Sequence, residues 1–150
     1  MEIWELVARE SIRDLVARYN ANGDSGRFEQ VLDVFAEDAT MELVTQEGGT
    51  RRFEGRAGIR SLFTETKDTW GALARERSTP HHVRHVTGTH QIDVGDQERA
   101  SSRCYFFVLM PHGLDHWGRY LDTFGVRDGR WLIVHRRVVT DGRVDSGYTG

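Results

Sequence analysis

Histidine is the residue type whose placement first suggests chemistry in this chain. Four of its seven histidines fall within one short stretch, at His81, His82, His85 and His90. Imidazole binds metal ions such as Zn²⁺ and also exchanges protons near neutral pH. The stretch could therefore belong to a metal site or to an acid–base site.

The spacing of these histidines argues against a metal site. Neighbouring side chains of an extended strand point to opposite faces, so His81 and His82 cannot both join His85. His82 and His90 could share a face, but they lie far apart along a strand, and further ligands would have to come from another element. The sequence therefore predicts no bound metal and no other cofactor.

The single cysteine, Cys104, excludes an internal disulfide and a cysteine-based metal site. We expect it to be a small buried apolar residue.

Composition limits the remaining classes. The chain has 150 residues, of which 38% are hydrophobic and 29% charged, with a formal net charge of -3. This balance is typical of one globular domain and offers no electrostatic attraction to nucleic acid or to an anionic membrane. No apolar run approaches the roughly 20 residues of a membrane span, and the acidic N-terminus lacks the layout of a secretory signal. We expect a single domain over residues 1–150, located in the cytoplasm.

The elements that must position the histidines begin with helices. Apolar residues three and four apart predict an amphipathic helix over 4–19, a short one over 28–35 and a third over about 57–70. Turn-forming residues separate the first two, and Asp24 or Ser25 in that turn is interpreted as a cap of the second helix.

The remaining segments indicate strands. A short hairpin is predicted from Thr40–Thr45 and the segment around Phe53. After Pro80 the chain is expected to form four strands near residues 82–94, 101–109, 116–126 and 131–139, with a tight turn at Asp128-Gly129. Helices segregated from an antiparallel sheet predict an α+β fold.

The order of these elements and several motifs resemble the SnoaL-like branch of the nuclear transport factor 2-like superfamily. The motifs are Ala17-Arg18-Tyr19, Asn22-Gly23-Asp24-Ser25-Gly26, Val34-Phe35-Ala36-Glu37-Asp38-Ala39-Thr40, Phe53-Glu54-Gly55-Arg56-Ala57-Gly58-Ile59 and Asp128-Gly129-Arg130-Trp131-Leu132-Ile133. The resemblance covers nearly the whole chain. It implies a cone-shaped α+β barrel in which three N-terminal helices pack on a curved antiparallel sheet.

Two enzymes of that superfamily, scytalone dehydratase and hexachlorocyclohexane dehydrochlorinase, use an Asp–His pair in a deep apolar pocket. By resemblance, the pair here would be Asp24 and His85, the latter in the setting His85-Val86-Thr87-Gly88-Thr89. His85 would act as general base, and Asp24 would fix its tautomer. The second pocket histidine of scytalone dehydratase has its nearest counterpart in His112 or is replaced by Met110.

Further residues are expected to bind the substrate. Tyr19 matches the oxyanion-stabilising tyrosine of ketosteroid isomerases, whereas Leu43 stands where their general-base Asp would be, which argues against that mechanism. Leu43, Phe63 and His82 are expected to line the pocket, whose ligand would be a small apolar or polycyclic molecule.

Structural readings compete with these roles. His85 could be an ordinary strand histidine, and alternation separates it from the apolar residues Val86 and Ile92. Either the polar face of that strand lines the pocket, or a bulge near Gly88 changes the alternation. Arg136 and Arg137 are expected to be solvated or paired with acidic neighbours such as Asp122, although one of them could instead face the cavity.

Three functions remain open. The first is a cofactor-independent acid–base enzyme, such as a dehydratase, another lyase, a cyclase or an isomerase. The second is a non-catalytic protein that binds a small molecule. The third is an assembly protein like an oxygenase β subunit. The continuous apolar run 105–110 predicts a strand buried on both faces, one of them in a homodimer or homotrimer.

Overall fold

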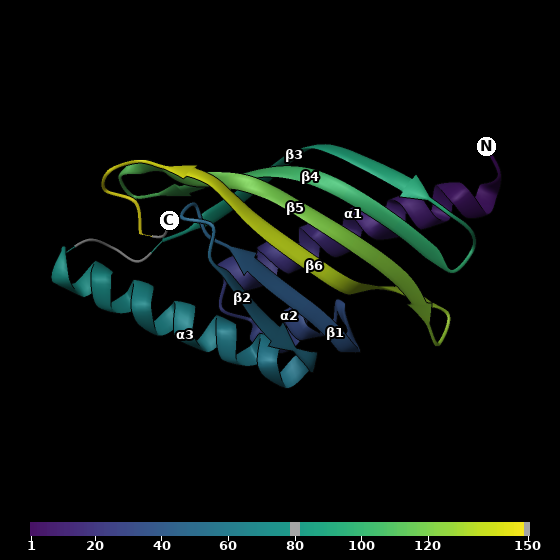
Figure 1. The fold of residues 1–150 in the computed structure, drawn as a ribbon, viewed down its shortest axis with the longest axis horizontal. Coiled ribbons are helices and arrows are strands. Elements are labelled where there is room, and N and C mark those ends of the chain that lie inside the picture. Colours follow the sequence, from purple (N-terminus) through teal and green to yellow (C-terminus); the bar gives the residue numbers. More distant parts are fainter. Residues whose placement is uncertain (79–81, 149–150) are drawn as a thin grey trace.

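The computed structural model describes residues 1–78 and 82–148 (Figure 1). Its elements, in chain order, are α1 (Ile3–Asp24), α2 (Phe28–Leu32), β1 (Phe35–Val44), β2 (Thr50–Glu54), α3 (Gly55–Glu76), β3 (Arg84–Val94), β4 (Arg99–Met110), β5 (Gly113–Arg127) and β6 (Arg130–Arg143). Two residues named above, Pro80 and His81, lie outside the described part of the chain. Within that part, no helix has an apolar stretch long enough to cross a membrane.

The strands form one six-stranded sheet in the order β2-β1-β6-β5-β4-β3. The helices cover one face of it, with α1 beside β3 and α3 beside β1 and β2 (Figure 1). The predicted α+β, cone-shaped fold is confirmed. One detail differs, because β1 pairs with β6 in parallel while the other four pairings are antiparallel, so the sheet is mixed and unclosed.

Helix α1 continues five residues beyond the predicted end and includes the segment expected to be a turn. Tertiary contacts outweigh the low helix propensity of this segment. Asn20 is buried, and its Oδ1 accepts a hydrogen bond from the Tyr120 hydroxyl at 3.0 Å. Asp24 is therefore the last residue of α1. The predicted cap is wrong, because Arg27 precedes α2 and no side chain caps that helix.

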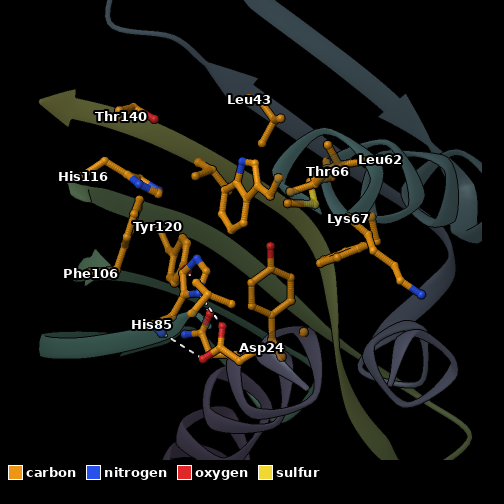
Figure 2. Close-up of a pocket in the computed structure, with 18 of the residues that line it drawn as sticks. Asp24, Leu43, Leu62, Thr66, Lys67, His85, Phe106, His116, Tyr120 and Thr140 are labelled. Carbon is orange, nitrogen blue, oxygen red and sulfur yellow. Dashed lines mark hydrogen bonds and ion pairs between the residues drawn. The ribbon is translucent and has the colours of Figure 1, made fainter. Parts of the chain in front are cut away.

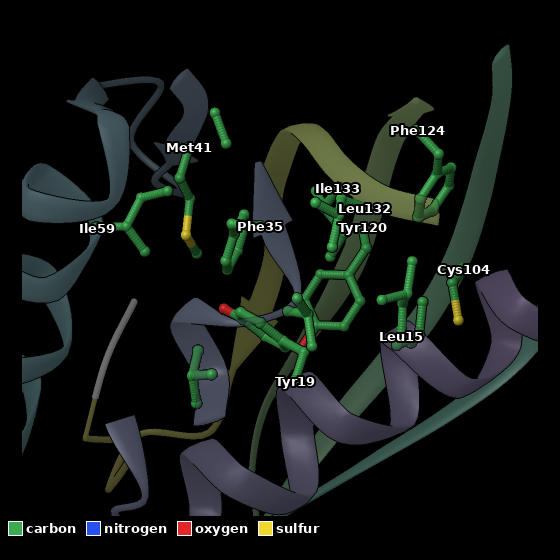
Figure 3. Close-up of a cluster of buried hydrophobic side chains, with 14 of the residues drawn as sticks. Leu15, Tyr19, Phe35, Met41, Ile59, Cys104, Tyr120, Phe124, Leu132 and Ile133 are labelled. Carbon is green, nitrogen blue, oxygen red and sulfur yellow. The ribbon is translucent and has the colours of Figure 1, made fainter. Parts of the chain in front are cut away.

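The second helix is shorter than predicted, and Phe35 belongs to β1. Backbone pairing explains the change, since Phe35 pairs with Ile133 and the Val34 carbonyl accepts from the Ile133 N–H at 2.8 Å. Phe35 and Ile133 are both fully buried in the core between helices and sheet (Figure 3). Spacing alone could not separate this strand start from a helical turn.

Helix α3 begins at Gly55 and reaches Glu76, beyond the predicted end at Trp70. The predicted tight turn between β5 and β6 is present, because Asp128 and Gly129 have φ values of 51° and 75°. Cys104 is buried, as expected.

A bulge in β3 decides which of its residues face the helices. Gly88 pairs with Tyr105 and Gln91 with Arg103, so three steps along β3 match two along β4. Thr89 has a positive φ of 50° inside the bulge. The extra residue changes the alternation, so that His85 and the buried Ile92 lie on the inner face while Val86 is exposed. Of the two alternatives left open, the bulge is the one present.

Strand β4 is buried on one face only within this chain. Phe106, Val108 and Met110 point inward, whereas Tyr105 and Phe107 are exposed by 53% and 40%. The prediction of a strand buried on both faces therefore does not hold for the isolated chain.

Candidate active site

A cavity of about 470 Å³ lies between the helices and the inner face of the sheet (Figure 2). Apolar and aromatic side chains supply the larger part of its wall, and polar groups such as Asp24, Lys67 and His116 supply the rest. Its lining consists of Tyr19, Asn20, Gly23, Asp24, Ser25, Gly26, Phe28, Met41, Leu43, Val44, Thr45, Leu62, Phe63, Thr66, Lys67, Trp70, Val83, His85, Phe106, His116, Tyr120, Val138 and Thr140. A small-molecule site commonly has this character.

Asp24 and His85 meet at this cavity, the first from the end of α1 and the second from the start of β3 (Figure 2). The His85 Nδ1 lies 2.6 Å from Asp24 Oδ1, and the His85 backbone N–H donates to Asp24 Oδ2 at 2.8 Å. Both carboxylate oxygens are thus used to fix one residue. The Asp24 side chain is 8% exposed and that of His85 20%.

This geometry gives the imidazole a defined tautomer. With Nδ1–H donated to the carboxylate, Nε2 is the ring nitrogen left to accept a proton at the cavity. Asp24 would also stabilise the imidazolium formed by that transfer. An imidazole held in this way is the arrangement that a general base uses.

A second carboxylate–imidazole pair, Asp115 and His116, occupies the start of β5. The His116 Nδ1 lies 2.6 Å from Asp115 Oδ2, and the ring lines the cavity. Asp115 is fully buried, and it also contacts His112 Nε2 at 2.8 Å and accepts from the Tyr148 backbone N–H at 2.9 and 3.1 Å. Burial opposes ionisation of Asp115, but these hydrogen bonds outweigh it and hold its pKa below the ordinary value.

Tyr19 lies in the wall beside a buried ion pair. Burial raises the pKa of Tyr19 to about 12, so its hydroxyl stays protonated. The Arg136 guanidinium stands 4.2 Å from the Tyr19 ring centre and 4.1 Å from that of Tyr120. Arg136 forms two hydrogen bonds with Asp122, at 2.8 and 2.7 Å, and both side chains are fully buried. Arg136 is not among the cavity-lining residues, so the interpretation of a pair with Asp122 is the one confirmed.

The sequence matches the model of the SnoaL-like domain over residues 4–137, which is most of the chain. The chain belongs to the SnoaL-like family. No curated protein matches its sequence.

Solved structures show the same fold. An NTF2-like protein with a cystatin-like fold from Novosphingobium aromaticivorans is 26% identical, with a TM-score of 0.75 over 94% of this chain and 87% of the other. A candidate scytalone dehydratase from the same organism is 19% identical, with a TM-score of 0.72 over 97% and 91%. A hexachlorocyclohexane dehydrochlorinase, LinA type 2, is 14% identical, with a TM-score of 0.75 over 96% and 92%.

The SnoaL-like fold brings most of the predicted site residues to one cavity. Asp24, His85, Tyr19, Leu43 and Phe63 all line it. His82 does not. It is exposed just before β3 begins and lies outside the cavity lining, so its predicted place in the site is wrong. In residues 1–78 and 82–148, no three His, Cys, Asp or Glu side chains are grouped to hold a metal ion.

Sequence reasoning missed His116 and its partner Asp115. The signal available was alternation along the predicted strand, which puts His116 on the same face as the buried Tyr120. The partner was hidden by a second bulge, where Val108 pairs with His116 but Leu109 pairs with Leu114. This extra residue, Asp115, lets adjacent side chains both be buried and in contact.

Proposed function

We propose that this SnoaL-like protein is a cofactor-independent acid–base enzyme that removes a proton from carbon in a small apolar molecule, with elimination as the reaction. The observation that carries the proposal is the Asp24–His85 contact of 2.6 Å at the wall of the largely apolar cavity. A buried carboxylate that fixes the tautomer of a cavity-facing imidazole is the arrangement a general base needs.

The remaining wall suits the same chemistry. The apolar side chains Phe63 and Leu43 would hold the body of the substrate, which is therefore compact or polycyclic. The protonated Tyr19 hydroxyl could donate to an enolate oxygen as negative charge develops there.

A turnover screen tests this function. A panel of fused-ring β-hydroxyketones is incubated with wild type, His85→Gln and Asp24→Asn, and enone formation is followed by absorbance. His135→Gln is the matched control, because His135 Nε2 lies 2.8 Å from Glu42 in a similar pair that does not line the cavity.

We expect His85→Gln to lower kcat/KM by roughly 10²–10⁴-fold and His135→Gln to leave it unchanged. If wild type binds panel members, as measured by calorimetry, but converts none of them faster than His85→Gln, the chain is a binding protein and the proposal is wrong.

The outer face of the sheet supports self-association. We infer that this face joins two or three copies of the chain. Val86, Phe107 and Trp117 stand side by side across β3, β4 and β5, and all three are exposed. Tyr105, Leu109 and Leu114 extend the same patch. We infer that a second copy of the chain covers this patch. The apolar side chains gather over β3, β4 and β5, whereas the rest of this face, over β1 and β6, carries ion pairs such as Glu42 with Arg137.

Light scattering after gel filtration tests the association. Wild type should have two or three times the mass of one chain. Phe107→Lys should reduce the mass to that of one chain, while Arg137→Glu on the charged half should not. A wild type that is monomeric at tens of micromolar, or a Phe107→Lys variant of unchanged mass, contradicts the inference.

A further inference from the structure

The Asp115–His116 pair lies near the Asp24–His85 pair, and both imidazoles line the same cavity. His85 and His116 occupy one cross-strand row, because His85 pairs with Val108 on β4 and Val108 pairs with His116 on β5. All three side chains therefore point to the inner face. The two imidazole centres are 6.3 Å apart, with their planes at 84° (Figure 2). Two rings at this separation can contact neighbouring atoms of one substrate.

The His116 ring, like that of His85, is positioned by a carboxylate. Its Nδ1 contacts Asp115, and its ring meets Trp70 and Phe106 edge-to-face at centre distances of 6.0 and 6.1 Å. With Nδ1 engaged, Nε2 is the ring nitrogen left for a ligand. Each imidazole thus presents the same atom to the cavity from a different strand.

Asp115 differs from Asp24 in its burial and in the number of its partners. Asp115 is fully buried and is held ionised by its hydrogen bonds. A buried carboxylate is costly unless a cation compensates it. Among the described residues its ion pairs are with His112 and His116.

Of these two imidazoles, His116 is the one that lines the cavity. Its contact with the carboxylate is the shorter, at 2.6 Å against 2.8 Å for His112.

We propose that His116 is the general acid of this site, that Asp115 is its positioning residue, and that the group expelled is therefore a hydroxyl. This rests on the proposed function. His85 Nε2 takes the proton from carbon, the C–H electrons form the C=C bond, and the C–O bond breaks with its electron pair going to oxygen. His116 Nε2 gives its proton to that oxygen, which departs as water. Transfer of one proton from His85 back to His116 through solvent restores the enzyme.

A pair of substrates that differ only in the leaving group tests His116. One carries the β-hydroxyl, and the other carries a β-chloride, which leaves without a proton. We expect His116→Gln and Asp115→Asn to slow loss of water by about 10²-fold or more, and loss of chloride by less than about 5-fold. His85→Gln should slow both reactions. A merely structural role for His116 would slow both equally, and that result, or no effect on either, overturns the proposal.

A second measurement needs no turnover and no stable variant. If wild type converts neither substrate, the proposed function has failed, and ¹⁵N NMR of the imidazoles then decides the proton assignment by itself. The proposal requires a doubly protonated His116 ring in wild type at neutral pH. A neutral His116 beside a charged His112, or two neutral rings, contradicts it.

Discussion

Replacement of Asp122 by Ala tests how much of the unfolding free energy depends on the partner of the buried Arg136 charge. Both side chains are fully buried, and the guanidinium lies between the rings of Tyr19 and Tyr120. Burial opposes the charge of Arg136, but Asp122 outweighs it and keeps the Arg136 pKa raised. Without Asp122 this charge would remain buried and uncompensated, which costs about 3–5 kcal/mol of unfolding free energy.

Urea unfolding followed by circular dichroism measures this loss. For a domain of this size it corresponds to a fall in Tm of roughly 6 to 20 °C. Asp141→Ala is the matched control, because Arg119 and Asp141 pair across the same strands, β5 and β6, at 3.0 Å on the surface. Its expected cost is under about 1 kcal/mol.

Removing both charges shows whether the stability lost in Asp122→Ala comes from the uncompensated Arg136 charge or from lost packing. Asp122→Leu combined with Arg136→Met should recover most of the stability lost in Asp122→Ala, because no uncompensated charge then remains. Equal costs for Asp122→Ala and Asp141→Ala would refute the reasoning, as would a double variant no more stable than Asp122→Ala.

Two further predictions concern the sheet and the buried carboxylate. Gly118→Ala should destabilise the protein by more than about 2 kcal/mol in urea unfolding, because the new Cβ would lie 1.9 Å from the Val139 carbonyl oxygen. The control is Gly88→Ala, whose new Cβ meets open space and should change stability by less than about 1 kcal/mol. Equal stability of these two variants would contradict the reasoning. Because the pKa of Asp115 is lowered in the fold, its stabilisation is present above the ordinary value of 3.8 and is lost as the pH falls through the lower folded-state pKa. Thermal melts should therefore show a flatter loss of stability below about pH 4 for Asp115→Asn than for wild type, and parallel curves would argue against an ionised Asp115.

The sequence carried the local signals of the fold. Apolar spacing located α1 and α3, because an amphipathic helix must bury one stripe. Apolar stretches separated by turn residues located the four long strands after Pro80, and Asp128-Gly129 marked the turn between β5 and β6, because few residues accept a positive φ there. Element ends were less well predicted, as at α1, whose last turn depends on the contact between Asn20 and Tyr120.

The site depended on resemblance for Asp24 and His85, which no local pattern could join across 61 residues. Tertiary structure decided what alternation could not. An extra residue at Thr89 turns Ile92 to the same face as His85, and another at Asp115 brings that carboxylate to His116. A bulge shifts every later residue by one position, yet the sequence shows no gap where it occurs. Residue types and periodicity were thus set by the sequence alone, whereas strand register, and with it the second Asp–His pair, was set by the packing of the sheet against the helices.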